Sequence, residues 1–152
     1  MIAQAIAAVL QPNDVLVLGG DLGAGKTTFT KALGAALGIT EPITSPTFTL
    51  HQQYHGGRLV LHHLDVYRID QIDEVIDLAL PELFESEGVV AIEWGDTIAP
   101  ALPAGFALLS FEFGDGDDDR AISLTAVGSA WTARVPGLEA ALAGRLIDRQ
   151  DA

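Results

Sequence analysis

The run Val15-Leu16-Val17-Leu18-Gly19-Gly20-Asp21-Leu22-Gly23-Ala24-Gly25-Lys26-Thr27-Thr28 decides the fold of this 152-residue chain. Its first four residues are apolar and bounded by turn residues, which indicates a buried parallel strand. The residues from Lys26 to Leu37 have helical spacing, and Gly38 is a natural helix C-cap. A strand, a glycine-rich loop and a helix in this order predict an α/β protein.

The glycine-rich part matches the phosphate-loop pattern G-x-x-x-x-G-K-[ST] in full. Glycines let the backbone curl so that successive N–H groups surround a β-phosphate, and the helix N-terminus adds its positive dipole. Lys26 is expected to reach the β- and γ-phosphates, and the Thr27 hydroxyl to ligate Mg²⁺. A glycine-rich turn that matches by chance is the alternative, which the flanking strand and helix disfavour. The expected nucleotide-binding residues are Gly20, Asp21, Leu22, Gly23, Ala24, Gly25, Lys26, Thr27 and Thr28.

The base of this nucleotide is expected to be adenine. P-loop proteins that are specific for guanine usually carry an N-K-x-D motif. The single asparagine of this chain is Asn13, which lies ahead of the phosphate loop, so the motif is absent. ATP is therefore preferred over GTP by elimination.

A Mg²⁺ site needs at least one more oxygen ligand, usually an acid at a strand end beside the phosphate loop. Asp65 follows the mostly apolar run 59–64, and Glu93 follows the run 89–92. An acid in this position lies at the carboxyl edge of the sheet, where ligands bind in open α/β folds. We expect Thr27, Glu93 and Asp65 to hold the metal; the alternative is that each acid caps the next turn.

Three further features have a functional and a structural interpretation. A threonine in the loop Thr44-Ser45-Pro46-Thr47 would contact the metal or the γ-phosphate, or the loop is a plain turn with local hydroxyl bonds. Arg68 would bridge a carboxylate or a phosphate, or form a surface ion pair. His62 and His63 fall on opposite faces of a strand, so we interpret them as satisfied structural histidines rather than joint metal ligands.

The rest of the chain predicts more strands and helices but no second domain. Strands are expected over residues 47–54 and 58–64, which form a hairpin, and over residues 107–113 and 121–127, which flank a solvated acidic turn. Helices are expected over residues 2–10, 72–84 and 137–149. We expect one domain over residues 1–152, in which residues 131–152 form a C-terminal helix packed on the rest.

The composition excludes several classes of protein. The chain has 21 acidic and 8 basic residues, a formal net charge of -13, so phosphates of DNA, RNA or a membrane surface would repel it. It has no cysteine, which excludes disulfides and cysteine-ligated zinc and is compatible with the cytoplasmic location we expect. The N-terminus lacks a signal-peptide pattern, and no run of about 18 apolar residues predicts a membrane span.

Four motifs in a fixed order resemble the bacterial TsaE (YjeE) family. They are the phosphate loop through Phe29, Ser45-Pro46-Thr47-Phe48-Thr49-Leu50, His63-Leu64-Asp65-Val66-Tyr67-Arg68 and Ile92-Glu93-Trp94-Gly95. The resemblance implies a three-layer α/β P-loop fold, a mixed sheet that includes antiparallel strands, and binding of ATP and Mg²⁺. It further implies a weak ATPase that acts on the TsaD–TsaB complex, which installs threonylcarbamoyl on A37 of tRNAs reading ANN codons. The protein would then contact tRNA only indirectly.

The resemblance also implies roles for four residues outside the phosphate loop. Glu93 would join the metal site, and Asp65 would be the Walker B-like acid. Thr47 would lie in a switch-like loop, and Trp94 would pack near that loop and affect hydrolysis. Family members commonly have a longer segment before the first helix that helps to enclose the adenine. Met1 lies inside that helix here, so either this segment is short or other residues contact the base.

Two other functions stay open on the sequence alone. One is a small-molecule kinase, but such kinases usually close an arginine-bearing lid over the transferred phosphoryl group. The chain has no lysine or arginine between Ile69 and Gly105, which disfavours that lid. The other is a nucleotide-gated interaction module, which differs from the accessory ATPase mainly in whether turnover is required.

Overall fold

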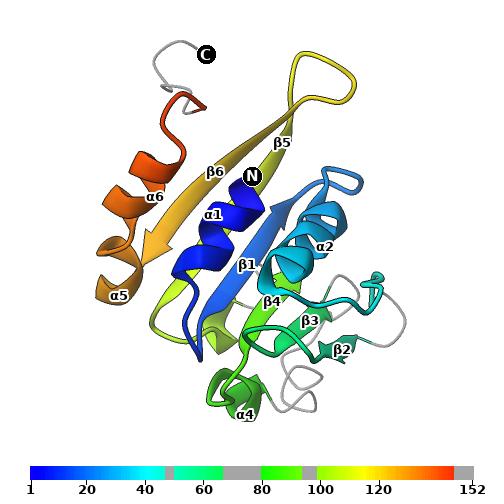
Figure 1. The fold of residues 1–152 in the computed structure, drawn as a ribbon, viewed down its shortest axis with the longest axis vertical. Coiled ribbons are helices and arrows are strands. Elements are labelled where there is room, and N and C mark those ends of the chain that lie inside the picture. The colour runs from blue at the N-terminus through cyan, green and yellow to red at the C-terminus, as the bar shows by residue number, and fades with distance from the viewer. Residues whose placement is uncertain (47–49, 67–79, 94–98, 146–152) are drawn as a thin grey trace.

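A six-stranded mixed sheet organises the protein in the computed structural model, which describes residues 1–46, 50–66, 80–93 and 99–145. The strands lie in the order β2-β3-β4-β1-β5-β6 (Figure 1). Strands β3, β4, β1 and β5 pair in parallel, whereas β2 and β6 pair antiparallel at the two edges. Their bounds are Val15–Gly20 for β1, His51–Tyr54 for β2, Leu61–Asp65 for β3, Val89–Glu93 for β4, Phe106–Phe113 for β5 and Arg120–Val127 for β6.

Helices cover both faces of this sheet. Their bounds are Ile2–Val9 for α1, Lys26–Leu37 for α2, Leu80–Phe84 for α4, Ser129–Thr132 for α5 and Val135–Ala141 for α6. Leu16 and Leu18 of β1 pack with residues of α1, α2, α5 and α6, whereas Val15 and Val17 pack on the opposite face with Leu80 of α4. The alternation of side chains along β1 separates these two cores. The three-layer α/β fold with a mixed sheet is therefore confirmed.

Most expected elements are present, with differences at their ends. Helix α2 has the expected bounds, and β2 and β3 form the expected hairpin, although β2 begins at His51. Helix α6 begins at Val135, earlier than expected, because Pro136 suits the first turn of a helix, where its missing N–H is not needed. It ends at Ala141, so the helix expected over residues 142–145 is wrong. Residues 72–79 and 146–149, where helix was expected, lie outside the described residues. In the described part of the chain, no helix is both long and apolar enough to span a membrane.

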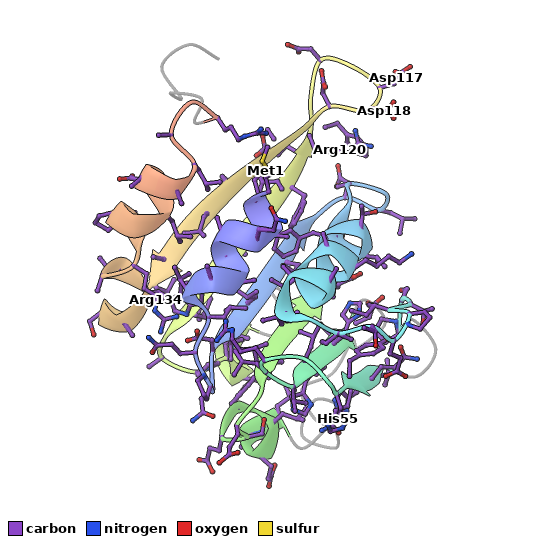
Figure 2. All side chains as sticks on the ribbon, in the orientation of Figure 1. Met1, His55, Asp117, Asp118, Arg120 and Arg134 are labelled. Atoms are coloured by element: carbon purple, nitrogen blue, oxygen red, sulfur yellow. The ribbon has the colours of Figure 1, made fainter. Side chains whose placement is uncertain are left out.

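Two residues of the C-terminal segment attach it to the start of the chain. Trp131 of α5 is buried, and the guanidinium of Arg134 lies 4.6 Å from the centre of its ring. The same guanidinium donates to Asp14 Oδ2 at 2.6 Å and to Gln11 Oε1 at 3.3 Å. Arg134 lies beside the turn between α1 and β1 (Figure 2). This ion pair joins residues 120 positions apart, so it connects the segment between α5 and α6 to the turn between α1 and β1.

We expect Arg134→Ala to lower the free energy of unfolding by about 1–3 kcal/mol, because it leaves the buried Asp14 carboxylate without its cationic partner and with only the Gln11 N–H as a donor. Urea unfolding measures this change. Arg145→Ala, which removes an exposed arginine, is the matched control and should change stability by less than about 0.5 kcal/mol. Equal stabilities of the two variants would contradict the prediction. A single cooperative transition would also support the one-domain organisation, which stays a prediction.

Candidate nucleotide and metal site

The glycine-rich loop connects the carboxyl end of β1 to the N-terminus of α2. Gly20 has φ 131°, and a Cβ atom there would lie 2.5 Å from the backbone oxygen of Phe111 on β5. Gly25, which precedes the first residue of α2, has φ 109°. Side chains are disfavoured at both backbone conformations, so this loop shape requires glycine at these two positions. The loop thereby ends at the positive end of the α2 dipole.

Lys26, the first residue of α2, is buried and held over this loop. Its Nζ donates to the backbone oxygens of Gly20 at 2.6 Å and of Asp21 at 2.9 Å. Only 5% of the residue is exposed, so water screens the ammonium charge poorly. A poorly screened positive charge beside a helix N-terminus suits an anion such as a phosphate, and the role of Lys26 toward a nucleotide stays a prediction.

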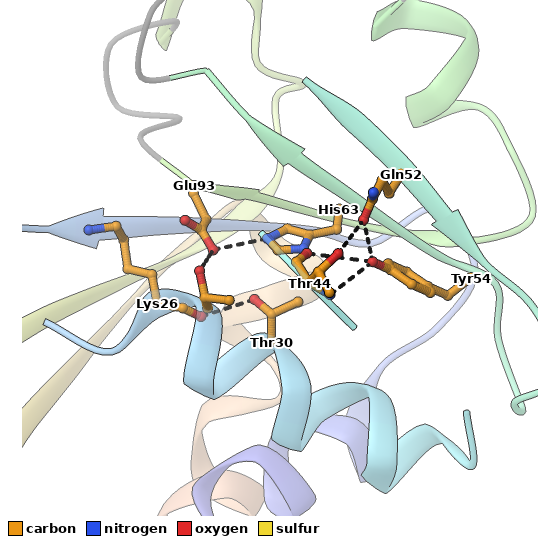
Figure 3. Close-up of polar contacts among 8 residues, drawn as sticks. Lys26, Thr30, Thr44, Gln52, Tyr54, His63 and Glu93 are labelled. Carbon is orange, nitrogen blue, oxygen red and sulfur yellow. Dashed lines mark hydrogen bonds and ion pairs between the residues drawn. The ribbon is translucent and has the colours of Figure 1, made fainter. Parts of the chain in front are cut away.

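Glu93, the last residue of β4, is connected to the glycine-rich loop by a hydrogen bond with Thr27. The Thr27 hydroxyl donates to Glu93 Oε1 at 2.7 Å, and His63 Nε2 donates to the same oxygen at 2.9 Å (Figure 3). The contact forms because β1 and β4 are parallel neighbours, with Leu18 opposite Glu93. The loop and the strand-end carboxylate therefore share one edge of the sheet.

Two opposing effects set the pKa of Glu93. Burial raises this pKa, but the hydrogen bonds from His63 and Thr27, together with the positive charge of Lys26, outweigh burial and lower the pKa below its usual value. The carboxyl group is therefore ionised at neutral pH. Two hydrogen-bond donors hold this ionised carboxylate in one orientation, so it can serve as a cation ligand without rearranging.

Asp65, the last residue of β3, lies beside Glu93. The two acids are register partners on adjacent parallel strands, and both are buried. The backbone N–H of Asp65 donates to the oxygen of Leu50 at 3.0 Å, and the N–H of Leu50 donates to the oxygen of Pro46 at 2.7 Å. These bonds connect the end of β3 to both sides of the loop after α2. The structure thus brings Thr27, Glu93 and Asp65 together at the carboxyl edge.

This set of side chains fits Mg²⁺. Hydroxyl and carboxylate oxygens are the ligands that Mg²⁺ prefers. Because the Thr27 hydroxyl gives its hydrogen to Glu93, its lone pairs face away from that bond and can bind a cation. In the described residues, no group of three or more His, Cys, Asp or Glu side chains could hold a metal alone. Mg²⁺ is commonly bound by one or two carboxylates together with nucleotide phosphates.

Comparison with known proteins identifies the family. The model of the family described as "Threonylcarbamoyl adenosine biosynthesis protein TsaE" matches residues 1–122. The chain belongs to the TsaE family. This confirms the resemblance found in the sequence, and the match ends within β6, before α5 and α6.

Individual TsaE proteins resemble the chain over most of its length. The TsaE protein of Bacillus subtilis is 48% identical over 130 residues, which cover 86% of this chain and 80% of that protein. The TsaE protein of Streptomyces coelicolor is 35% identical over 132 residues, which cover 83% of this chain and 88% of that protein. The crystal structure of Bacillus subtilis YdiB matches with a TM-score of 0.76 and 40% identity, over 92% of this chain and 86% of that one.

The loop after α2 in this TsaE protein begins with local contacts. Thr44 Oγ1 donates to Gln52 Oε1 at 3.2 Å, and the Thr44 N–H donates to the Tyr54 hydroxyl at 3.2 Å. These contacts favour the plain-turn interpretation for Thr44. Thr47, Arg68 and Trp94 lie outside the described residues, so the roles expected for them stay predictions.

His62 and His63 face opposite sides of β3, but they differ in their contacts. His62 lies 3.1 Å from His51 Nε2 through Nδ1 and 3.2 Å from Ser86 Oγ through Nε2. His63 bonds to Glu93, and its Nδ1 is buried without a hydrogen-bond partner in the described part of the chain. The expectation that His63 is a fully satisfied histidine is therefore wrong at Nδ1. The two-residue period of a strand was the missed signal, because it places His63 on the same face as Asp65.

The pKa of His62 makes the stability of this TsaE protein sensitive to pH. Burial, followed by the charges of His51 and His55, lowers the pKa of His62 to about 4. An unfolded histidine titrates near 6.5, so the unfolded chain binds the proton more readily between these two values. The contribution of neutral His62 to stability is complete above the unfolded pKa and is lost as the pH falls toward the folded pKa.

We expect acidification from about pH 7 to about pH 4 to cost on the order of 2–3 kcal/mol more in wild type than in His62→Gln, which cannot titrate at this position. Urea unfolding across that pH range measures the difference. Parallel stability curves for the two proteins would contradict the prediction.

Proposed function

We propose that this chain is a Mg²⁺-dependent ATPase, weak on its own, that serves threonylcarbamoyl modification of A37 in tRNAs reading ANN codons. In this proposal it acts on the TsaD–TsaB complex. The hydrogen bond between Thr27 and Glu93 carries the proposal, because it joins the phosphate loop to the strand-end acids. Membership of the TsaE family supports the pathway.

Each residue of the site has a defined task in this proposal. Lys26 and the loop N–H groups bind the phosphates of ATP, while Thr27, Glu93 and Asp65 would hold Mg²⁺. The metal, when bound, neutralises phosphate charge and orients the phosphoryl group. Glu93 is ionised and fixed before any ligand arrives, so little reorganisation is needed during the reaction.

The charge distribution supports a protein partner rather than direct contact with tRNA. The net charge is -13, and four of the described basic residues bond or stack within the chain itself. These residues are Lys26 on the phosphate loop, Arg58 on the backbone oxygens of Ala7 and Leu10, Arg120 on the ring of Phe113, and Arg134 on Asp14. The acidic surface that is left complements a basic protein surface, and tRNA would be held by the partner. A cytoplasmic location follows from this task.

We expect Lys26→Ala to weaken ATP binding by more than about 100-fold, because it removes a buried charge whose bonds to phosphate contribute about 1.5–3 kcal/mol each. Calorimetric titration with ATP measures the affinity. Lys31→Ala, which removes an exposed lysine of the same helix, is the matched control and should bind like wild type. Wild-type affinity in Lys26→Ala would contradict a phosphate-binding role.

An ATPase assay tests the whole proposal. We expect slow Mg²⁺-dependent hydrolysis by the chain alone and faster hydrolysis with TsaD, TsaB and tRNA. Glu93→Ala should lower the rate by roughly 10–100-fold, because the metal loses a ligand, whereas it should keep ATP binding without Mg²⁺. Glu85→Ala, at an exposed glutamate, is the control.

Three results would overturn parts of this proposal. Absence of hydrolysis in wild type, both alone and with the partners, would exclude the ATPase. Rapid phosphorylation of a metabolite without the partners would favour the small-molecule kinase. Normal hydrolysis by Glu93→Ala would exclude the metal role of this carboxylate.

A further inference from the structure

We propose that His63 is a positioning residue of the nucleotide site, whose Nε2–H holds the Glu93 carboxylate in the orientation in which it meets Thr27. The inference rests on the proposed ATPase function and adds a residue to it. His63 would touch neither the nucleotide nor the metal and would act through Glu93.

The geometry of the carboxylate is the first argument. Oε1 of Glu93 accepts from Thr27 at 2.7 Å and from His63 at 2.9 Å. Two donors on one oxygen fix the rotation of the carboxylate about its last bond. The second oxygen of Glu93 then points toward the side on which Lys26 lies (Figure 3). Removing the His63 donor would leave Thr27 alone to hold the carboxylate, which could then rotate.

The strand register explains how the histidine reaches this carboxylate. His63 of β3 is opposite Ala91 of β4, and Glu93 is two residues further along β4 on the same face. The small Ala91 side chain leaves room for the imidazole to lean along the strand toward its diagonal neighbour. Both residues of the pair are buried, so water does not compete for the hydrogen bond.

Stability alone does not account for a histidine at this position. His63 is 0% exposed, and its Nδ1 has no hydrogen-bond partner in the described residues. Burying an unpaired polar atom costs free energy, which an apolar side chain would avoid. Leu61, two residues earlier on the same face, is equally buried and apolar. The bond to Glu93 is what the histidine provides and a leucine could not.

The neighbouring histidine offers a matched control. His62 is also buried, but it faces the other side of β3 and contacts His51 and Ser86. A change at His62 therefore disturbs the same strand by a similar change in volume without touching Glu93. It separates an effect on the strand from an effect on the carboxylate.

The test compares four variants, His63→Gln, His63→Asn, His63→Leu and His62→Gln. Glutamine places an amide N–H near the position of histidine Nε2, whereas asparagine places it near Nδ1. We measure ATP affinity without Mg²⁺, the Mg²⁺ concentration that half-saturates ATP binding, kcat and KM for hydrolysis, and the unfolding temperature.

His63→Asn and His63→Leu should raise the half-saturating Mg²⁺ concentration and lower kcat by roughly 10-fold or more, as expected for a lost partner of a metal-binding carboxylate. ATP affinity without Mg²⁺ should stay within about 2-fold of wild type, because this affinity comes from the loop and Lys26. His63→Gln should recover most of the loss, and His62→Gln should match wild type in its Mg²⁺ dependence.

Equal behaviour of the glutamine and asparagine variants would overturn the inference, as would a loss in His62→Gln as large as in His63→Asn. The inference would also be overturned if the His63 variants bound ATP more weakly without Mg²⁺ and unfolded at a lower temperature to a similar degree. That result would indicate that His63 is purely structural. These results differ from failure of the proposed function, in which wild type itself shows no Mg²⁺-dependent hydrolysis.

Discussion

The hydrogen bond between the Thr27 hydroxyl and Glu93 joins two residues 66 positions apart and defines the geometry of the site. It can form because β4 lies parallel to β1 as its neighbour, so that both strands end at the same edge of the sheet. The phosphate loop, the start of α2 and the end of β3 are all placed around this edge. A shift of β4 by one residue would turn Glu93 to the other face and separate it from the loop.

The site concentrates buried polar groups at the end of an otherwise apolar sheet. Lys26, His63, Asp65 and Glu93 are all buried, although charged residues are rarely buried without partners. Hydrogen bonds to backbone oxygens, to Thr27 and between side chains compensate the loss of hydration. For the proposed nucleotide and metal, these groups would therefore already be arranged before binding, which would reduce the free energy needed to organise them.

Most of the described positive charges of this acidic chain are engaged within the chain itself. Lys26, Arg58, Arg120 and Arg134 contact carbonyls, carboxylates and rings of the chain itself, so they help to hold the fold and the site together. The surface then carries mostly negative charge. In the proposed function, such a surface would favour a basic protein partner and repel free nucleic acid.

The sequence by itself determined the strand, loop and helix from Val15 to Leu37, because short-range periodicity and glycine chemistry encode these elements locally. It also placed Asp65 and Glu93 at strand ends. Only the tertiary structure decided that these acids are register partners, that His63 bonds to Glu93, and how the C-terminal helices attach. The physical reason is that such contacts join distant residues, and strand order and register, which no local pattern specifies, determine which side chains meet.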